Sequence, residues 1–249
     1  RRGGIFSPLF YITMKYIIFF FLTLITITDV FAKGNEFNES FSKSKQILKN
    51  EVYYDNKLTF YCEALFDNDG NIFQNSDFLI SKFKNRNSTI EWEHIVPAEN
   101  FGRSFSEWRD GHPQCRNKHG KSFRGRKCAR KMNREFRLIE SDMYNLVPAI
   151  GSINALRSNY NFDCVSDIEY EVCRMKIGNG KIEPHERIRG FIARTYLYMD
   201  KEYKYFKMSR KTKKLMLSWD KLYPVTEWEC IRAKRIERVQ GNRNVFVIN

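Results

Sequence analysis

The alternation of apolar and polar positions predicts a strand and then a helix in the middle of the chain. Residues 90–96 are β-branched, aromatic or charged in near alternation, which predicts a strand that runs into Pro97. Further along, apolar residues recur at alternating steps of four and three, which predicts a helix over 132–146 that Pro148 ends. The apolar stripe of this helix consists of Met132, Phe136, Ile139, Met143 and Leu146.

The last third of the chain is predicted to be helical. Apolar residues over 188–199 recur at helical spacing. Ser209 is placed to cap a helix that stops before Pro224, and a capping box beginning at Thr226 opens a helix that closes at Gly241. A strand in one region and helices in others predict an α+β fold with a small antiparallel sheet and several surrounding helices.

The N-terminal residues have the pattern of an export signal. A basic start at Met14 is followed by the apolar run 16–27 and then by small residues, which predicts a secretory signal peptide over 14–32. The run is short for a membrane span, so an uncleaved anchor is the alternative, and no stable membrane anchor is expected after cleavage. Residues 1–13 are expected to be an upstream extension, and residues 33–249 a single domain.

Charge narrows the class of partner. The 249 residues include 43 Lys and Arg against 29 Asp and Glu, a formal net charge of +14. Such a charge favours a polyanionic partner through long-range attraction, but leaves nucleic acid, anionic lipid and acidic polysaccharide open. Residues 102–130 are rich in Gly, Arg, Lys and His without an apolar period, which predicts a long basic loop.

The cysteines predict disulfides. An even number in an exported chain favours disulfide bonds over metal ligation, although six cysteines allow fifteen pairings. Cys115 and Cys128 are placed to clip the basic loop. No structural zinc is expected, because no Cys-x-x-Cys pair and no paired-ligand spacing of His is present. The six are Cys62, Cys115, Cys128, Cys164, Cys173 and Cys230.

Adjacent Glu93 and His94 in the predicted strand point to phosphodiester chemistry. Hydrolysis needs a base for the attacking water, and a neutral His can serve near neutral pH. It also needs positive charge at the phosphate, which a Mg²⁺ ion on carboxylate and amide oxygens can supply. Asn145 lies off the apolar stripe of the predicted helix, so packing does not require it there and its amide oxygen is a candidate second ligand.

Six separated segments resemble one family in the same order along the chain. The chain resembles the bacterial endonuclease I family, which comprises periplasmic and secreted nonspecific nucleases of the ββα-metal (His-Me finger) class. The resemblance extends from about residue 61 essentially to the end of the chain. The matching segments are 91–98 (E-W-E-H-I-V-P-A), 125–128 (G-R-K-C), 140–148 (E-S-D-M-Y-N-L-V-P), 192–199, 223–230 and 239–242.

The resemblance implies a role for each candidate site residue. His94 is implied to be the general base. Glu93 and Asn145 are implied to hold one divalent metal ion, Mg²⁺, with Mn²⁺ or Ca²⁺ able to occupy the same site. Arg126 is implied to contact the cleaved phosphate, and Arg126 and Arg157 are implied to bind nucleic acid.

The resemblance also implies a fold and an activity. The fold implied is a ββα-metal core in which a small antiparallel sheet carries the base. The activity implied is cleavage of double- and single-stranded DNA, and of RNA, with little sequence preference and with 5′-phosphate ends. A monomeric protein of the periplasm or the secreted fraction is expected.

The chain departs from the family pattern at Tyr144, where His is frequent, and at residues 155–156, where Ala-Leu replaces Gly-Asp. Two other functions compete with the nuclease hypothesis. A noncatalytic exported nucleic-acid-binding protein would need the charge but not His94. A cell-wall glycosidase would use the carboxyls of Glu91 and Glu93, but would leave His94 and the basic loop without a role.

Overall fold

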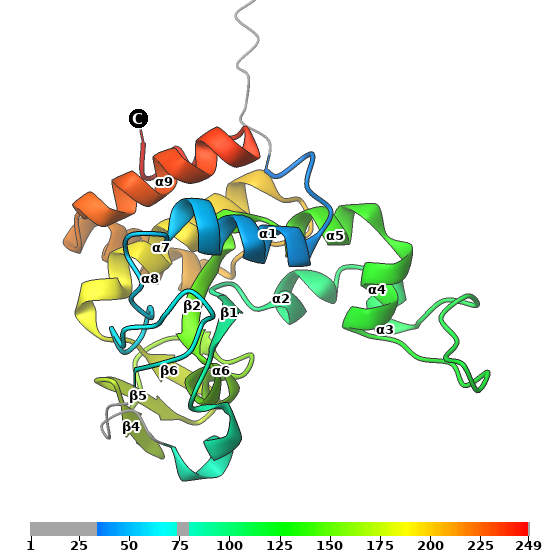
Figure 1. Cartoon of the computed structure of the whole chain (residues 1–249), viewed down its shortest axis with the longest axis horizontal. Helices are drawn as coiled ribbons and strands as arrows, with labels where there is room; N and C mark the ends of the chain where they lie inside the picture. Colours follow the sequence, from blue (N-terminus) through cyan, green and yellow to red (C-terminus); the bar gives the residue numbers. More distant parts are fainter. Residues whose placement is uncertain (1–33, 74–79, 249) are drawn as a thin grey trace, which may run out of the picture. The chain divides into compact units, whose positions relative to one another are not determined.

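The computed structural model describes residues 34–73 and 80–248, so the predicted extension 1–13 and signal peptide 14–32 lie outside the described residues. The described part of the chain is mixed α+β, as predicted, with two small sheets and several helices (Figure 1). In this part, no helix is both long and apolar enough to cross a membrane.

The centre of the fold is a strand–strand–helix unit. Strands β1 (Ile90–His94) and β2 (Leu146–Ile150) pair antiparallel, and the register places His94 opposite Leu146. Helix α6 (Gly151–Arg157) follows β2 directly and contacts both strands. Strand β1 is therefore confirmed, and His94 lies at its carboxyl end.

The predicted helix over 132–146 is wrong. The chain instead forms α4 (Arg126–Met132), α5 (Arg134–Glu140) and a short 3₁₀ helix (Met143–Asn145) before β2 begins. Asn133 interrupts the helical path, because its backbone is extended and its side chain caps the N-terminus of α5. All five residues of β2 are buried, so this strand lacks the apolar–polar alternation by which a strand is recognised.

The C-terminal helices agree with their prediction. Helices α7 (Glu186–Glu202), α8 (Arg210–Leu222) and α9 (Glu227–Gln240) form in the expected order. Ser209 and Thr226 cap α8 and α9, because each side chain accepts a hydrogen bond from a backbone N–H in the first turn.

The remaining elements surround the central unit. The second sheet has the strand order β3-β6-β5-β4, in which β3 and β6 are parallel and the other pairs are antiparallel. The strands of this second sheet are β3 (Asn161–Phe162), β4 (Tyr170–Val172), β5 (Met175–Gly178) and β6 (Lys181–Glu183). The other elements outside the central unit are α1 (Phe41–Ile47), a π-helical turn (Leu48–Val52), a 3₁₀ segment (Ser81–Arg86), α2 (Ala98–Gly102) and α3 (Ser106–Arg109).

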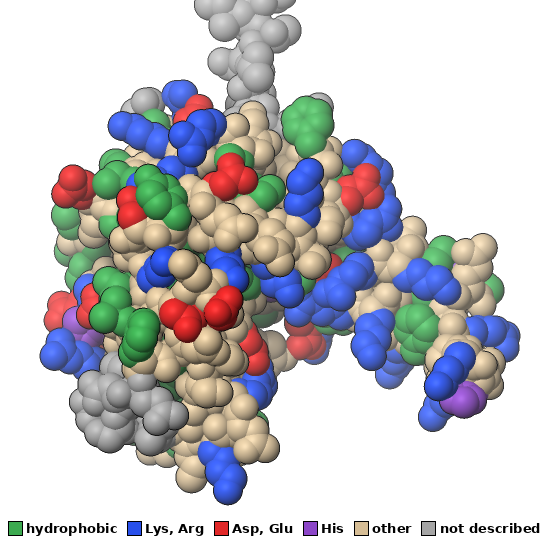
Figure 2. Space-filling model, in the orientation of Figure 1, with side chains coloured by type: hydrophobic (Ala, Val, Ile, Leu, Met, Phe, Trp, Pro, Cys, Tyr) green, Lys and Arg blue, Asp and Glu red, His purple; other side chains and the backbone are tan. Residues whose placement is uncertain are grey.

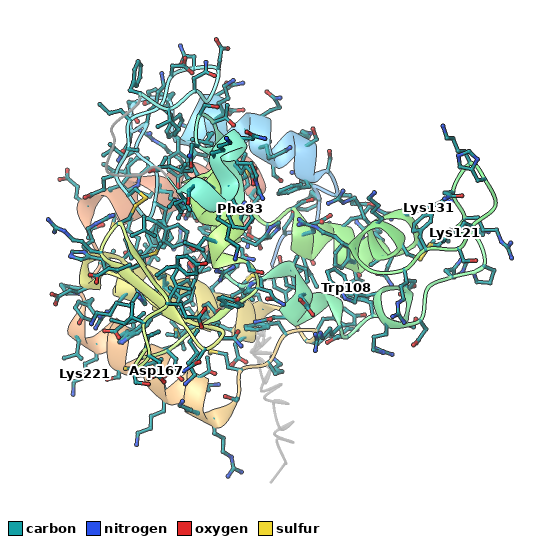
Figure 3. All side chains as sticks on the ribbon, turned by 90° about the horizontal axis from the view of Figure 1, so that it is seen from below. Phe83, Trp108, Lys121, Lys131, Asp167 and Lys221 are labelled. Carbon is teal, nitrogen blue, oxygen red and sulfur yellow. A yellow bond between two sulfur atoms is a disulfide. The ribbon has the colours of Figure 1, made fainter. Side chains whose placement is uncertain are left out.

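The predicted basic loop 102–130 is a loop only in its middle. Helices α3 and α4 occupy its two sides, and residues 110–125 connect them without a helix or strand. We call residues 110–125 the arm. Figures 1 and 3 show it projecting from the rest of the described chain beyond α3 and α4.

Two disulfides are present in the described residues. Cys115 and Cys128 are bonded, which confirms the predicted clip of the arm onto α4. Cys62 and Cys173 are bonded across a sequence separation of 111 residues, so this bond removes many unfolded conformations in the chain-entropy account. The free cysteines are Cys164 and Cys230.

Candidate active site

A cleft of about 360 Å³ opens where β1, α2, α4 and α6 meet. Of the residues predicted for the site, Glu93, His94, Arg126 and Arg157 line this cleft. Asn145 does not line it. The charged and polar groups of the cleft therefore come from three separate parts of the sequence.

His94, a residue of the cleft, has one protonated ring nitrogen and one unprotonated ring nitrogen. Its Nε2 lies 2.9 Å from the backbone carbonyl oxygen of Glu140, and since a carbonyl only accepts, Nε2 must carry the proton. The lone pair is then on Nδ1, which lies 3.5 Å from Nη2 of Arg126. Burial and the charge of Arg126 lower the pKa of His94 to about 3, so the imidazole is neutral at neutral pH.

Glu140 organises two arginines as well as His94. Its buried carboxylate accepts hydrogen bonds from Nε and Nη2 of Arg130, each at 2.6 Å, and from Nε of Arg126. Burial alone raises the pKa of the Glu140 carboxyl, but the hydrogen bonds and charges of Arg130 and Arg126 outweigh burial and lower it. One residue thus fixes the imidazole through its backbone and the guanidinium groups through its side chain.

Arg126 is the accessible cation of the cleft. It begins α4, and 38% of its side chain is exposed. Its guanidinium carbon lies 5.3 Å from the ring centroid of Phe41, whose ring in turn stacks on His94 with centroids 5.1 Å apart. Arg126 is therefore held on two sides while the remaining N–H groups of its guanidinium stay available to an anion.

Glu93 is a buried carboxylate beside a buried arginine. It is 5% exposed, and its Oε1 lies 2.9 Å from Nη1 of Arg157 and 3.5 Å from the hydroxyl of Tyr61. Burial raises the pKa of Glu93 to about 7, although the charge of Arg157 lowers it in part. A positive charge in the cleft would therefore favour its ionised form strongly.

Arg157, which was predicted to contact nucleic acid, is buried inside the protein. Its side chain is 1% exposed. Besides Glu93, its guanidinium donates to the backbone carbonyls of His94, at 2.9 Å, and Ile95. These bonds hold the chain at the end of β1, so Arg157 orients Glu93 and His94 from below the cleft surface, and its contact with nucleic acid stays a prediction.

The structure also places Asn145 away from the ligand position predicted for it. The residue is fully buried, its Oδ1 accepts from the backbone N–H of Val96 at 2.7 Å, and its Nδ2 donates to the carbonyl of Val96 at 3.0 Å. Its backbone carbonyl accepts from Ile95. Asn145 thus extends the pairing of β1 and β2 by a side-chain bridge, and the expectation that packing does not require it is wrong.

Asn159 and Asn154 are amide residues that line the cleft, whereas Asn145 does not, and Asn154 is the one that belongs to the central unit. It lies on α6 and lines the cleft beside Glu93. Its Nδ2 donates to Oε2 of Glu91 at 2.7 Å, and Glu91 is fixed in turn by Arg86. Because Glu91 accepts from the NH₂ group, the amide oxygen of Asn154 points away from that carboxylate. Sequence reasoning missed Asn154 because its place in the cleft depends on strand β2, which the apolar pattern did not predict.

These groups define a class of chemistry. A neutral imidazole with an unprotonated nitrogen beside Arg126, a buried carboxylate, an amide and an accessible arginine line one cleft of a basic protein. This set can accept a proton from water and neutralise charge on an anionic ester, which is the chemistry of a phosphate-ester hydrolase.

Comparison with known proteins identifies the family. Residues 32–249 match the family Endonuclease I. An Endonuclease-1 from Buchnera aphidicola subsp. Baizongia pistaciae (strain Bp) is 38% identical over 244 residues, which cover 92% of this chain and 93% of that protein. An Endonuclease-1 from Buchnera aphidicola subsp. Acyrthosiphon pisum (strain APS) is 43% identical over 174 residues, 68% of this chain and 64% of that protein. A periplasmic deoxyribonuclease of Aeromonas hydrophila is 35% identical over 235 residues, 91% of each chain.

This chain belongs to the endonuclease I family, and it is an endonuclease. The family predicted from the sequence segments is thereby confirmed. Two disulfides in the described residues fit an exported protein.

Proposed function

We propose that this endonuclease hydrolyses the phosphodiester bonds of DNA and RNA with little sequence preference, leaves 5′-phosphate ends, and uses His94 as general base. The observation that carries the proposal is the orientation of His94, whose Nε2 is held by the Glu140 carbonyl while Nδ1 lies 3.5 Å from Nη2 of Arg126, a second residue of the cleft. The names of two relatives from Aeromonas hydrophila, an extracellular and a periplasmic deoxyribonuclease, support DNA as the substrate.

Proton transfer to His94 is the first part of the proposed mechanism. A water in the cleft gives its proton to Nδ1 as its oxygen attacks the phosphorus. The P–O3′ bond breaks as the new O–P bond forms, so the phosphate stays on the 5′ end and the departing 3′ oxygen takes a proton from solvent. The imidazole then becomes positively charged, and its Nε2–H bond to the Glu140 carbonyl strengthens because the donor is now charged. The neutral starting state of His94, which burial and Arg126 maintain, is the state that this step requires.

Arg126 is proposed to bind the phosphate that is cut. An arginine can pair with two phosphate oxygens at once, and the guanidinium of Arg126 is fixed by Glu140 and by the ring of Phe41. Such a preorganised cation stabilises charge as it develops on the phosphate without reorganisation during the reaction.

A single divalent cation, Mg²⁺, is proposed to bind Glu93 and Asn154. The donors fit a hard cation: both are oxygens that line one cleft, one from a carboxylate and one from an amide. Among the described residues no three His, Cys, Asp or Glu side chains gather around a common point, so retained waters would complete the shell of such an ion. When bound, a divalent cation supplies positive charge against the phosphate and the leaving oxygen.

The arrangement of the central unit supports the proposal of a ββα-metal core. Strand β1 carries Glu93 and His94, β2 pairs with it, and α6 carries Asn154. We therefore propose Asn154 in place of Asn145 as the partner of Glu93 at the cation site. The Asn145 bridge to Val96 then serves to hold the end of β1 in place.

The proposed lack of sequence preference follows from what the cleft groups can contact. His94, Arg126, Glu93 and Asn154 address a phosphate and its counter-charge, and phosphate contacts carry no base information. Because RNA presents the same phosphodiester, RNA is included in the proposal. Activity in the periplasm or outside the cell agrees with the disulfides and with the names of the relatives.

Plasmid nicking by the purified oxidised protein tests the proposal. Supercoiled plasmid is incubated with Mg²⁺, with EDTA, and with the variant His94→Ala, and His185→Ala serves as the matched control because His185 lies at the start of α7 outside the cleft. Cleavage that requires Mg²⁺ and His94, but not His185, is expected. Binding of DNA without nicking in Mg²⁺ would instead support a noncatalytic nucleic-acid-binding protein.

A further inference from the structure

The arm, residues 110–125, carries positive charge that nothing in the described protein neutralises. From residue 111 to residue 131 the sequence has Lys and Arg at many positions and no Asp or Glu. On the arm itself Arg116, Lys118, Lys121 and Arg124 are all exposed. Within the described residues none of these four forms an ion pair, whereas Arg126 and Arg130 are paired with Glu140.

The arm is rigid enough to hold this charge in one place. The Cys115–Cys128 disulfide fastens its first half to α4. Backbone hydrogen bonds join Phe123 to Cys115 at 2.8 Å and Asn117 to Lys121 at 2.9 Å, which makes the end of the arm a short hairpin. Asn117 closes the turn, because its side chain accepts from two backbone N–H groups on the far side. A preformed surface of this kind loses little entropy on binding.

The arm leads directly into the candidate active site. Its last residue, Gly125, is followed by Arg126, and the Gly125 N–H donates to the carbonyl of Trp108, which itself lines the cleft. Figure 3 shows Trp108 near the root of the arm and Lys121 and Lys131 toward its far end. In Figure 2, Lys and Arg side chains gather over α4 and the arm. Charge therefore continues from the proposed phosphate site outward along one projection.

We propose that the arm is a second nucleic-acid contact, which binds backbone phosphates of a DNA duplex to one side of the cleavage site. The inference rests on the proposed function for the choice of DNA as the polyanion. Charged side chains spaced along a fixed hairpin suit the regular row of phosphates on a duplex and read no sequence. The arm then contributes affinity and substrate placement, while Arg126 and His94 carry out the chemistry.

The test measures DNA binding separately from cleavage. In the His94→Ala protein with EDTA present, binding of a fluorescent duplex of about 20 base pairs is followed by anisotropy over a range of salt concentrations, since a longer duplex offers more phosphates. The arm variant combines Arg116→Gln, Lys118→Gln, Lys121→Gln and Arg124→Gln. The matched control removes the same charges elsewhere, at exposed positions of α8 and α9: Arg210→Gln, Lys214→Gln, Lys221→Gln and Arg238→Gln.

The arm variant is expected to bind DNA at least ten times more weakly than the parent near 0.1 M salt. The slope of log K against log salt is expected to become less steep by about 0.9 for each phosphate that the arm no longer binds. Loss of two or three phosphate contacts would therefore reduce the slope by about two to three. The control should retain most of the parent affinity and slope. Thermal melting of both variants, which change only exposed side chains, establishes that each is folded.

Three results would overturn the proposal. Equal loss of affinity in the arm variant and the control would show attraction by overall charge alone, and an unchanged arm variant would show that the arm does not touch DNA. Binding of both variants to vesicles that contain anionic lipid is measured as well. If the arm variant lost vesicle binding but kept DNA binding, the arm would be a membrane contact instead. Failure of the protein with intact His94 to cut plasmid in Mg²⁺, with the arm result intact, would refute the proposed hydrolysis while leaving the DNA contact in place.

Discussion

The ring of Phe41 stacks on the imidazole of His94, with centroids 5.1 Å apart and ring planes 28° apart. The same ring lies 5.3 Å from the guanidinium carbon of Arg126 and 5.9 Å from that of Arg130. A residue of helix α1, far away in sequence, therefore touches the proposed base and the proposed phosphate ligand at once. Neither the apolar pattern nor the family resemblance assigned a role to it.

Replacing Phe41 by Leu is expected to lower kcat about three- to tenfold with a smaller change in KM. Leu keeps apolar volume but removes the stacking and the cation–π attraction, which is worth about 0.5–1 kcal/mol for each exposed cation. Steady-state kinetics on a defined duplex measure the effect. Phe37→Leu is the control, because Phe37 is 79% exposed and lies outside the cleft. Equal kinetics for the two variants would refute a positioning role for Phe41.

Asn154→Ala and Asn145→Ala are expected to fail in different ways. Without Asn154 the protein should fold normally but need about 10- to 100-fold more Mg²⁺ for activity, the usual range when support of a metal site is removed. Without Asn145 the buried N–H and C=O of Val96 have no partner, which costs about 1–3 kcal/mol for each group. The melting temperature and the Mg²⁺ titration of activity separate the two. If Asn145→Ala were stable but needed more Mg²⁺ for activity than the parent, Asn145 would be favoured as the ligand instead.

Glu140→Gln is expected to reduce activity by about tenfold or more, because a small displacement of catalytic groups has effects of that order. The substitution keeps the backbone carbonyl that orients His94, but removes the charge that holds Arg126 and Arg130. The loss should therefore appear mainly in steps that involve the phosphate. Kinetics are compared with Glu135→Gln, an exposed position on the same helix. Unchanged activity in Glu140→Gln would contradict the organising role.

The buried carboxyl of Glu202 is expected to make the free energy of unfolding depend on pH. Its Oε1 is buried without a hydrogen-bond partner in the described structure, and burial, with the charge of Asp142, raises its pKa to about 7 from an ordinary value of 4.5. The unfolded chain therefore ionises first, and Glu202 costs the folded state increasing stability as pH rises from 4.5 to 7. Glu202→Gln should melt higher than the parent at pH 8, and the difference should vanish near pH 4. A constant difference at both pH values would contradict this account.

Several predictions from the sequence were confirmed, and each was a matter of local order. Strand β1 has an alternating pattern, and helices α7, α8 and α9 have apolar stripes with recognisable caps. The Cys115–Cys128 bond joins two residues with a sequence separation of only 13. Glu93 and His94 are neighbours on one strand, whereas the fold brings Arg126, at the start of α4, to the same cleft.

What the sequence did not predict depended on the environment of each residue. Strand β2 has five buried residues in a row, so periodicity could not distinguish it from the end of a helix. Asn145 and Asn154 are nine positions apart and chemically identical. They differ in their hydrogen-bond partners: Asn145 bonds to Val96 and holds the end of β1, whereas Asn154 bonds to Glu91 and lines the cleft. Arg157 has the charge of a nucleic-acid contact but the 1% exposure of a core residue.

The sequence by itself determined the family, the export pattern, the net positive charge that favours a polyanion, and the adjacency of a carboxylate and an imidazole at 93 and 94. Tertiary structure alone decided which amide faces the cleft, which arginine stays accessible, and that Phe41 lies against the base. The physical reason is that charge and periodicity are properties of neighbouring residues in the chain. Burial and hydrogen-bond partners depend on segments such as α1, β2 and α6 that meet only when the chain folds.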